Sequence, residues 1–211
     1  MSLPAKALRP RALMTTGTPS PMGTGGFSPL SPRTLKEIVK LELFEQEGRE
    51  KCAEVWRSYH AEKRDAVGTT IPAEACKSLL LRAKKCPMMI FPVFKSTGSF
   101  LMLVGQFQQN VFLLTYLEEY RKNPNTASPW ISIAVYDELT STKGLGMLRA
   151  DFMPNLTKRE AEVLTEMLLA AYVDSLHPHT EAFNLRPNAF SFEQFTQDAS
   201  KEFAAKFIVK E

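Results

Sequence analysis

Cysteine is scarce in this sequence, and its placement excludes a disulfide framework. Only Cys52, Cys76 and Cys86 occur among the 211 residues, an odd number without a close pair. None of them has the spacing of zinc ligands. We therefore predict three reduced thiols, which are typical of a reducing compartment such as the cytosol, the mitochondrial matrix or the chloroplast stroma.

Long hydrophobic runs are also missing. The run Met88–Phe94, for example, has only seven residues and contains Pro92. A membrane-spanning helix needs roughly 20 consecutive apolar residues, so we expect no stable membrane insertion. With 44% hydrophobic residues, the chain nevertheless has enough apolar side chains to form a folded core.

The motifs that hold nucleotides and metal ions are absent. Gly144 and Gly146 are closely spaced, but they lack the Lys-Ser/Thr pair that follows the glycines of a phosphate-binding loop. His177 and His179 flank Pro178, and the sequence indicates no third metal ligand nearby. We therefore predict no cofactor and no metal site.

Patterns for acid–base or nucleophilic catalysis are missing as well. The adjacent carboxylates Glu118 and Glu119 point apart on a helix or a strand, which does not suit paired acid–base work. No Gly-x-Ser-x-Gly pattern marks a nucleophilic serine. The sequence favours a binding protein over an enzyme, and an active site assembled from scattered residues stays open as an alternative.

Acidic residues are missing from the beginning of the chain. Glu37 is the first of them, and residues 1–36 carry a charge of +5. Because the whole chain carries +3, residues 37–211 are left with −2. A folded part with net negative charge lacks the clustered cationic face that neutralises phosphates, so we expect it not to bind nucleic acid.

The first 33 residues have the composition of an unfolded segment. They contain six prolines, four glycines and many serines and threonines, and their apolar residues have no sustained period. Arginine-rich, acid-free N-termini are typical of organelle transit peptides. We predict that residues 1–33 form a disordered basic transit segment. A basic tail that contacts nucleic acid or an anionic membrane is the alternative.

Residues 34–211 are predicted to form a single domain that begins with helices. Thr34 and Glu37 form a capping box that opens a helix ending before Gly48. A second amphipathic helix follows, and a third is expected to begin at Pro72 and to stop before Pro87.

The end of the domain is also predicted to be helical. Thr157 and Glu160 form a second capping box, whose helix is expected to end near Pro178. After a connection that includes His177–Thr180, Ser191 and Gln194 are expected to cap a last helix with a heavy aromatic stripe.

The middle of the chain changes to short apolar runs typical of strands. Strands between two helical regions predict an α+β domain: a central mixed, largely antiparallel sheet of five or six strands, flanked by N-terminal and C-terminal helices. The five predicted strands are Met88–Phe94, Phe100–Phe107, Val111–Thr115, Trp130–Tyr136 and Leu145–Phe152.

Several blocks of this sequence, in the same order, resemble one family, the mitochondrial ATP synthase assembly factor 1 family. The resemblance covers about residues 34–195. Its blocks are Thr34–Phe44, Trp56–Lys63, Ile71–Glu74, Arg82–Pro87, Phe91-Pro92, Gly105–Gln108, Lys143-Gly144, Leu148-Arg149 and the stretch from Phe183-Asn184 through Pro187 to Phe190.

The resemblance implies an ATP-independent chaperone of the mitochondrial matrix, with no cofactor and no catalytic turnover. It would bind the unassembled beta subunit of the ATP synthase catalytic head, prevent its aggregation and hand it to the alpha subunit. A plastid counterpart that acts on the chloroplast enzyme is an alternative, because transit segments of both organelles are rich in serine and threonine.

Two kinds of partner contact are expected, an exposed sheet edge that adds a strand and an aromatic surface that receives apolar residues. We expect the first near the end of the second predicted strand. Because an aromatic stripe at helical spacing is more often core, the last helix stays ambiguous. The candidate partner-binding residues are Gly105, Gln106, Phe107, Gln108, Arg149, Phe190, Phe192, Phe195, Phe203 and Phe207.

Overall fold

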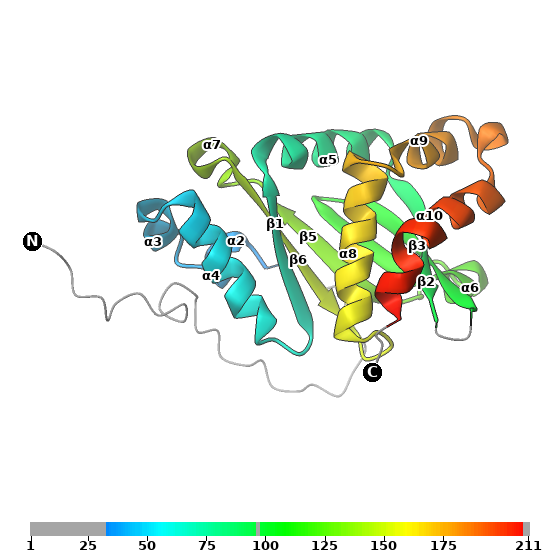
Figure 1. Ribbon diagram of the computed structural model, residues 1–211, viewed down its shortest axis with the longest axis horizontal. Helices are drawn as coiled ribbons and strands as arrows, with labels where there is room; N and C mark the ends of the chain where they lie inside the picture. Colours follow the sequence, from blue (N-terminus) through cyan, green and yellow to red (C-terminus); the bar gives the residue numbers. More distant parts are fainter. Residues whose placement is uncertain (1–32, 96–97, 209–211) are drawn as a thin grey trace, which may run out of the picture.

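The computed structural model describes residues 33–95 and 98–208 (Figure 1). The predicted transit segment, residues 1–33, lies outside the described residues except for Arg33. In the described part of the chain, no helix is long and apolar enough to cross a bilayer.

One six-stranded sheet forms the centre of the domain, with the strand order β1-β6-β5-β4-β3-β2. All five pairings are antiparallel. The predicted α+β class is therefore confirmed, while the described sheet has no parallel pair and is not mixed. The strands are β1 (Ala66–Pro72), β2 (Met88–Phe94), β3 (Phe100–Gln108), β4 (Val111–Tyr116), β5 (Pro129–Tyr136) and β6 (Leu145–Phe152).

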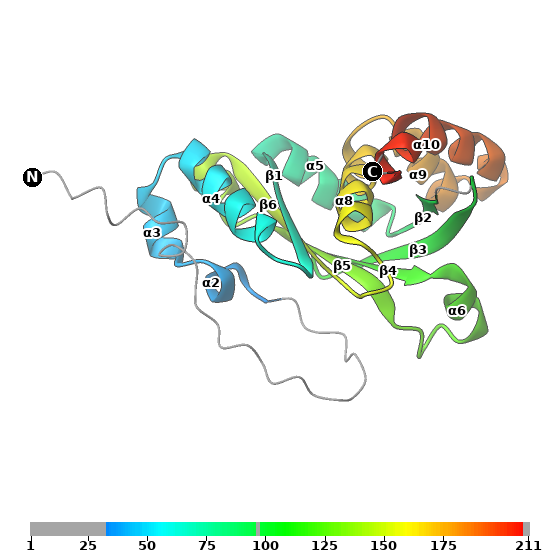
Figure 2. The ribbon, with the colours of Figure 1, turned by 60° about the horizontal axis from the view of Figure 1, so that its bottom comes forward.

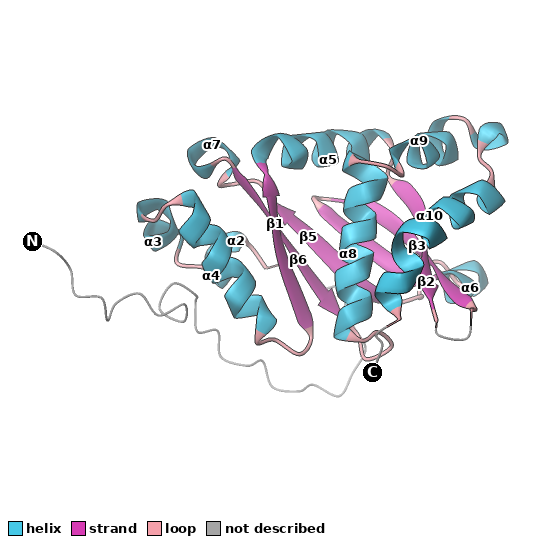
Figure 3. Ribbon diagram, in the orientation of Figure 1, coloured by secondary structure: helices cyan, strands magenta, loops and turns pink. Residues whose placement is uncertain are grey.

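Helices precede, interrupt and follow the strands (Figure 3). They are α2 (Leu35–Ile38), α3 (Leu41–Gln46), α4 (Arg49–Ala61), α5 (Ala73–Lys85), α6 (Leu117–Lys122), α7 (Thr140–Lys143), α8 (Lys158–Val173), α9 (His177–Leu185), the short 3-10 helix η2 (Pro187–Ala189) and α10 (Phe192–Phe207).

The sheet separates two hydrophobic cores. The larger core lies on one face, where α5, α8 and α10 pack against residues such as Phe91, Phe112 and Leu148. On the other face, α2, α3 and α4 bury Phe44 and Trp56 against the sheet. Figure 2 shows α4 beside β1 and β6, with α2 and α3 farther out at the same end of the domain, and α9 and α10 beside β2. Helices thus cover both faces of the sheet, because both faces carry apolar side chains that have to be buried.

The structure corrects three local predictions. Instead of one helix before Gly48, α2 ends at Ile38, because the backbone of the next residue, Val39, is extended and its side chain is fully buried. The third helix begins at Ala73, because Pro72 has extended backbone and closes β1. The connection around His177 is the helix α9, in which Pro178 occupies the first turn, a position where proline is tolerated.

The three cysteines are free and buried, as expected for reduced thiols. Burial raises the pKa of the Cys76 thiol to about 11. Cys76 packs closely on β6, because a Cβ atom added at Gly146 would lie 2.5 Å from the Cβ atom of Cys76. The thiol is therefore a packing group in the larger core, protonated at neutral pH.

The predicted capping box at the start of α8 is confirmed and extended by an ion pair. The Thr157 side chain accepts a hydrogen bond from the Glu160 backbone, and the Glu160 carboxylate accepts one of 2.8 Å from the Thr157 backbone. The same carboxylate pairs with Lys95 at the end of β2. Glu160 therefore ties the N-terminus of α8 to the sheet.

We expect this carboxylate to make stability fall in acid. Burial alone would raise the pKa of Glu160, but the hydrogen bonds from Lys95 and Thr157 outweigh burial and lower it below its usual value. A carboxyl group whose pKa is lower in the folded than in the unfolded state contributes its whole stabilisation at pH values above the unfolded-state pKa. This contribution is lost as the pH falls through the folded-state pKa. Glu160→Gln should therefore flatten the dependence of unfolding free energy on pH below about pH 5. Urea titrations of both proteins from pH 3 to pH 7 measure this, and parallel curves would contradict it.

Candidate functional site

Three of the five candidate phenylalanines in the C-terminal segment belong to the larger core. Phe195 and Phe203 are 1% exposed and Phe207 is 7% exposed. The Phe207 ring lies 5.9 Å from the ring of Phe94 on β2. These side chains attach α10 to the sheet, so a partner does not reach their rings while the domain is folded.

The other two phenylalanines lie nearer the surface. Phe192, the first residue of α10, is 49% exposed. Phe190 is half-buried, with its ring 5.1 Å from that of Phe183 and 6.0 Å from that of Phe195. Of the aromatic stripe, Phe192 is thus the side chain most available to a partner.

The Gly105–Gln108 segment is not at a sheet edge. It lies on β3, which pairs with β2 on one side and with β4 on the other, so strand addition cannot occur there. Gly105 has a packing role, because a Cβ atom at this position would lie 2.7 Å from the Phe91 ring.

The remaining residues of this segment have separate surroundings. The amide of Gln106 donates a 2.8 Å hydrogen bond to the Tyr120 hydroxyl on α6, and the Phe107 ring packs 4.7 Å from that of Phe112. Gln108 is exposed at the end of β3. These residues face different sides of the sheet and do not form one surface.

Arg149 lies on β6, on the sheet face that α4 covers, and is 8% exposed. Its guanidinium donates to both carboxylate oxygens of Asp151, with a shortest distance of 2.6 Å. Burial alone would lower the pKa of Arg149, but these hydrogen bonds outweigh burial and raise it. The Asp151 side chain is 43% exposed, so the carboxylate, rather than the arginine, meets solvent.

The two outer strands of the sheet differ in how they are protected. On β2, the Asn184 side chain donates to the Met88 carbonyl at 2.6 Å and accepts from the Met88 N–H at 3.1 Å. It therefore occupies the Met88 backbone groups, which an added strand would otherwise use at the start of β2. No described strand pairs with the outer side of β1, the opposite edge.

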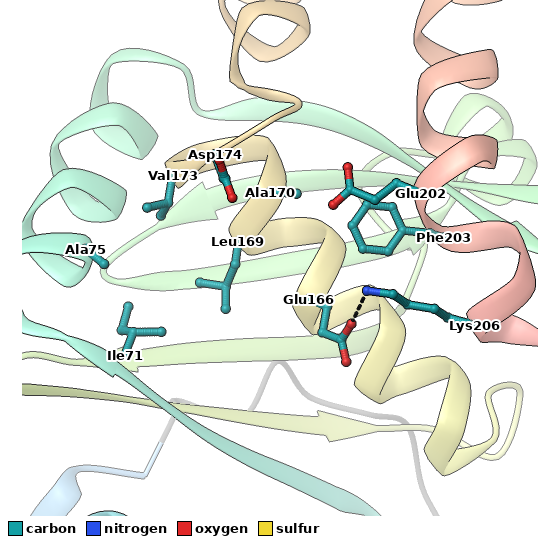
Figure 4. A pocket seen from close by; sticks show the side chains of 10 residues that line it. All are labelled: Ile71, Ala75, Glu166, Leu169, Ala170, Val173, Asp174, Glu202, Phe203 and Lys206. Carbon is teal, nitrogen blue, oxygen red and sulfur yellow. Dashed lines mark hydrogen bonds and ion pairs between the residues drawn. The ribbon is translucent and has the colours of Figure 1, made fainter.

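Beside β1 lies a groove of about 290 Å³ between β1, α5, α8 and α10 (Figure 4). Ile71, Ala75, Leu169 and Val173 contribute apolar side chains, and Phe203 lies at its inner wall. The wall is apolar because these residues lie at the rim of the larger core, where α8 lies across the face of the sheet beside β1.

The mouth of this groove is acidic. Glu166, Asp174 and Glu202 line it together with one cation, Lys206. The Lys206 ammonium lies 2.8 Å from the Glu166 carboxylate and joins α10 to α8 across the groove. A smaller cavity of about 230 Å³ continues along β1 and adds Glu162. Apolar walls with acidic rims suit a segment that carries apolar and basic side chains.

Sequence reasoning missed this groove because it did not predict β1. The segment 66–72 contains Gly68 and ends at Pro72, which weakens a strand pattern. A signal was present, however, because Val67, Thr69 and Ile71 alternate and all have β-branched side chains. In the structure these three residues share the face that carries the groove.

The family described as ATP11 protein matches residues 18–205 of this chain. The ATP synthase mitochondrial F1 complex assembly factor 1 of Homo sapiens is 27% identical over 164 residues, covering 76% of this chain and 49% of the human protein. The Danio rerio protein of the same name is 25% identical over 173 residues, covering 80% of this chain and 56% of the fish protein. The chain spans about half the length of the curated relatives it matches.

Proposed function

Because the chain belongs to the ATP11 protein family, we propose that it is an ATP-independent chaperone of ATP synthase assembly in the mitochondrial matrix. Its client is the unassembled beta subunit of the catalytic head, which it protects from aggregation and hands to the alpha subunit. The observation that carries this proposal is the family match over residues 18–205. The relatives named as assembly factors of the mitochondrial F1 complex support it.

The described surface suits this role. A subunit destined for an oligomer exposes apolar surface before assembly, and such surface aggregates unless it is covered. The chain offers an apolar groove beside an open strand edge, together with the exposed Phe192 ring. Each is a known kind of site for apolar or extended segments.

Release is by competition between partners. The sequence has no phosphate-binding loop, so we propose no energy-driven step. An alpha–beta interface with a larger apolar area and better-packed contacts displaces the chaperone by mass action if the two surfaces overlap. We propose that the protein neither binds ATP tightly nor hydrolyses it.

An aggregation assay tests the proposal. Isolated beta subunit that is diluted from denaturant should scatter less light when the full chain is present at near-equimolar ratio, without ATP. Added alpha subunit should then release the chaperone, which gel filtration detects. An unrelated aggregating enzyme is the control and should gain little protection. Aggregation that persists at several-fold excess of the chain, or alpha subunit that joins the complex without releasing the chain, would contradict the mechanism.

We further propose that residues 1–33 are a transit segment and that residues 34–211 are the working domain. The family match begins at residue 18, within this segment, so the cleavage site has to be measured. N-terminal sequencing of the native protein does so and also decides whether a basic tail remains. Import into isolated mitochondria and chloroplasts separates the mitochondrial protein from a plastid counterpart.

A further inference from the structure

The outer edge of β1 presents unpaired backbone groups at defined positions. The Phe152 N–H donates to the Asp65 carbonyl at 3.1 Å, which fixes the alternation of the β1–β6 ladder. In an antiparallel ladder, the residues between hydrogen-bonded pairs direct their N–H and C=O groups away from the partner strand. On β1 these residues are Ala66, Gly68, Thr70 and Pro72; Ala66 is buried and Pro72 has no N–H, whereas Gly68 and Thr70 have both groups and are only partly buried. An extended chain placed beside β1 would therefore meet donors and acceptors at strand spacing.

The two sides of this edge have opposite charge. On the groove side, Glu162 and Glu166 extend from α8, and each has a single cationic partner, Arg159 at 3.4 Å and Lys206 at 2.8 Å. Asp174 and Glu202 add further negative charge.

On the opposite side, α4 contributes two basic residues, Arg49 and Arg57, and one acidic residue, Glu50, to a cavity that reaches Thr70. Figure 1 shows β1 running between α4 and α8. An added strand would thus lie between an acidic helix and a helix with net positive charge.

We propose that this edge binds an extended segment of the client, which adds to the sheet as a seventh strand beside β1. The inference rests on the proposed function and specifies its contact. Side chains alternate between the two faces of a strand. The side chains of the client segment that face the groove are apolar and basic, and they complement Leu169 and the glutamates of α8. Its side chains that face α4 are polar or acidic, and they complement Arg57.

The contrast between the two edges supports this assignment. Exposed strand edges recruit other chains, and stable proteins usually cover or interrupt them. The β2 edge has the Asn184 side chain on its backbone and has Pro92, which lacks an N–H, at an outward position. On β1, proline occupies only the last outward position, Pro72, so the outward groups of Gly68 and Thr70 have neither device. An edge kept open beside an apolar groove is suited to reversible strand addition.

A proline substitution separates backbone pairing from other effects. Thr70→Pro removes an outward N–H without removing a bond to β6, and proline is tolerated at such edge positions. Thr70→Val keeps the N–H and a β-branched shape and is the matched control. The probe is a set of overlapping 15-residue peptides that covers the beta subunit, with binding measured by fluorescence anisotropy. We expect one or a few peptides with the alternating pattern to bind, with at least tenfold weaker binding to Thr70→Pro than to wild type or Thr70→Val.

Hydrogen exchange on the wild-type chain gives a second readout that does not depend on a folded variant. Intact beta subunit should slow exchange of the Thr70 amide at least tenfold. Unchanged exchange, or equal binding by folded Thr70→Pro and Thr70→Val, would overturn strand addition while leaving the aggregation result intact. Absence of any protection of beta subunit would instead overturn the proposed function. A concentration-dependent dimer that Thr70→Pro abolishes would identify a second copy as the occupant and overturn the client assignment.

Discussion

Replacing Phe203 by alanine is expected to lower the free energy of unfolding by about 3–5 kcal/mol, the usual cost of truncating a fully buried aromatic side chain. The Phe203 side chain is 1% exposed and joins α10 to the larger core. Its removal leaves a cavity at the inner wall of the groove, where α8, α10 and the sheet meet. Phe207→Ala should also destabilise the domain, with a smaller loss because this residue lies in the last turn of α10.

Phe192→Ala is the matched control for this prediction. Phe192 lies on the same helix but is 49% exposed, so its truncation should change unfolding free energy by less than about 0.5 kcal/mol. Urea denaturation followed by circular dichroism measures all three variants. A folded Phe203→Ala domain that fails to protect beta subunit would mean that the aromatic stripe is a binding surface rather than core. If Phe192→Ala alone lost protection at unchanged stability, the exposed ring would be the contact.

Trp56→Ala is expected to have an effect of similar size on the opposite face of the sheet, about 3–5 kcal/mol. Trp56 is fully buried at the centre of the smaller core. Its ring lies 4.3 Å from that of His60 and 6.0 Å from that of Tyr136, and its indole N–H donates to the Leu148 carbonyl at 3.2 Å. The substitution removes the packing of α4 on the sheet and the only side-chain bond described for that carbonyl.

Two variants separate these contributions. Trp56→Phe keeps most of the apolar area and removes only the indole N–H bond, while the Leu148 carbonyl stays in the β1–β6 ladder opposite Thr69, so this variant should cost about 0.5–1.5 kcal/mol. Arg57→Ala, at the next position on the exposed side of α4, should leave stability nearly unchanged. Thermal unfolding and near-ultraviolet circular dichroism follow the loss of the indole environment. Equal stability of Trp56→Ala and Arg57→Ala would show that the smaller core adds little to the fold.

The environment of Trp56 also determines the state of His60. Burial lowers the pKa of His60 to about 4, although its Nδ1 atom lies 2.8 Å from the Trp56 carbonyl oxygen. The imidazole is therefore neutral at physiological pH. A Cβ atom on Gly68 would lie 2.3 Å from the same nitrogen, so glycine at this position lets α4 approach β1. His60 is thus a packed core residue, and its role is to hold β1 beneath α4.

Local sequence determined the elements whose signals are short-range. The Thr157–Glu160 capping box fixes the start of α8, and Ser191 with Gln194 fixes the start of α10, because the hydrogen bonds span only three residues. The five predicted strands were recovered because continuous apolar runs bounded by turns rarely form anything else in an α+β domain. The match of consecutive blocks to one family likewise requires only the order of residues.

Tertiary structure decided which residues lie at a sheet edge, on the surface or in the core. Helical spacing placed Phe192, Phe195 and Phe203 on one helix, but only the packing of α10 against α8 and β2 buried two of them and exposed the third. The position of Gly105 inside the sheet follows from a strand order that no local pattern encodes.

The open edge of β1 depends on the same long-range order. β1 pairs with β6 although the two are far apart in the chain, Val67 with Ala150 at a separation of 150 − 67 = 83 residues for example, and this pairing leaves the backbone groups of Gly68 and Thr70 facing outward. The composition of the chain determined that a core would form, and local capping patterns determined where several helices begin. Local sequence did not determine which strand would lack a neighbour. That was decided only when distant segments paired, because the free energy of their contacts depends on surfaces that do not exist until the sheet has formed.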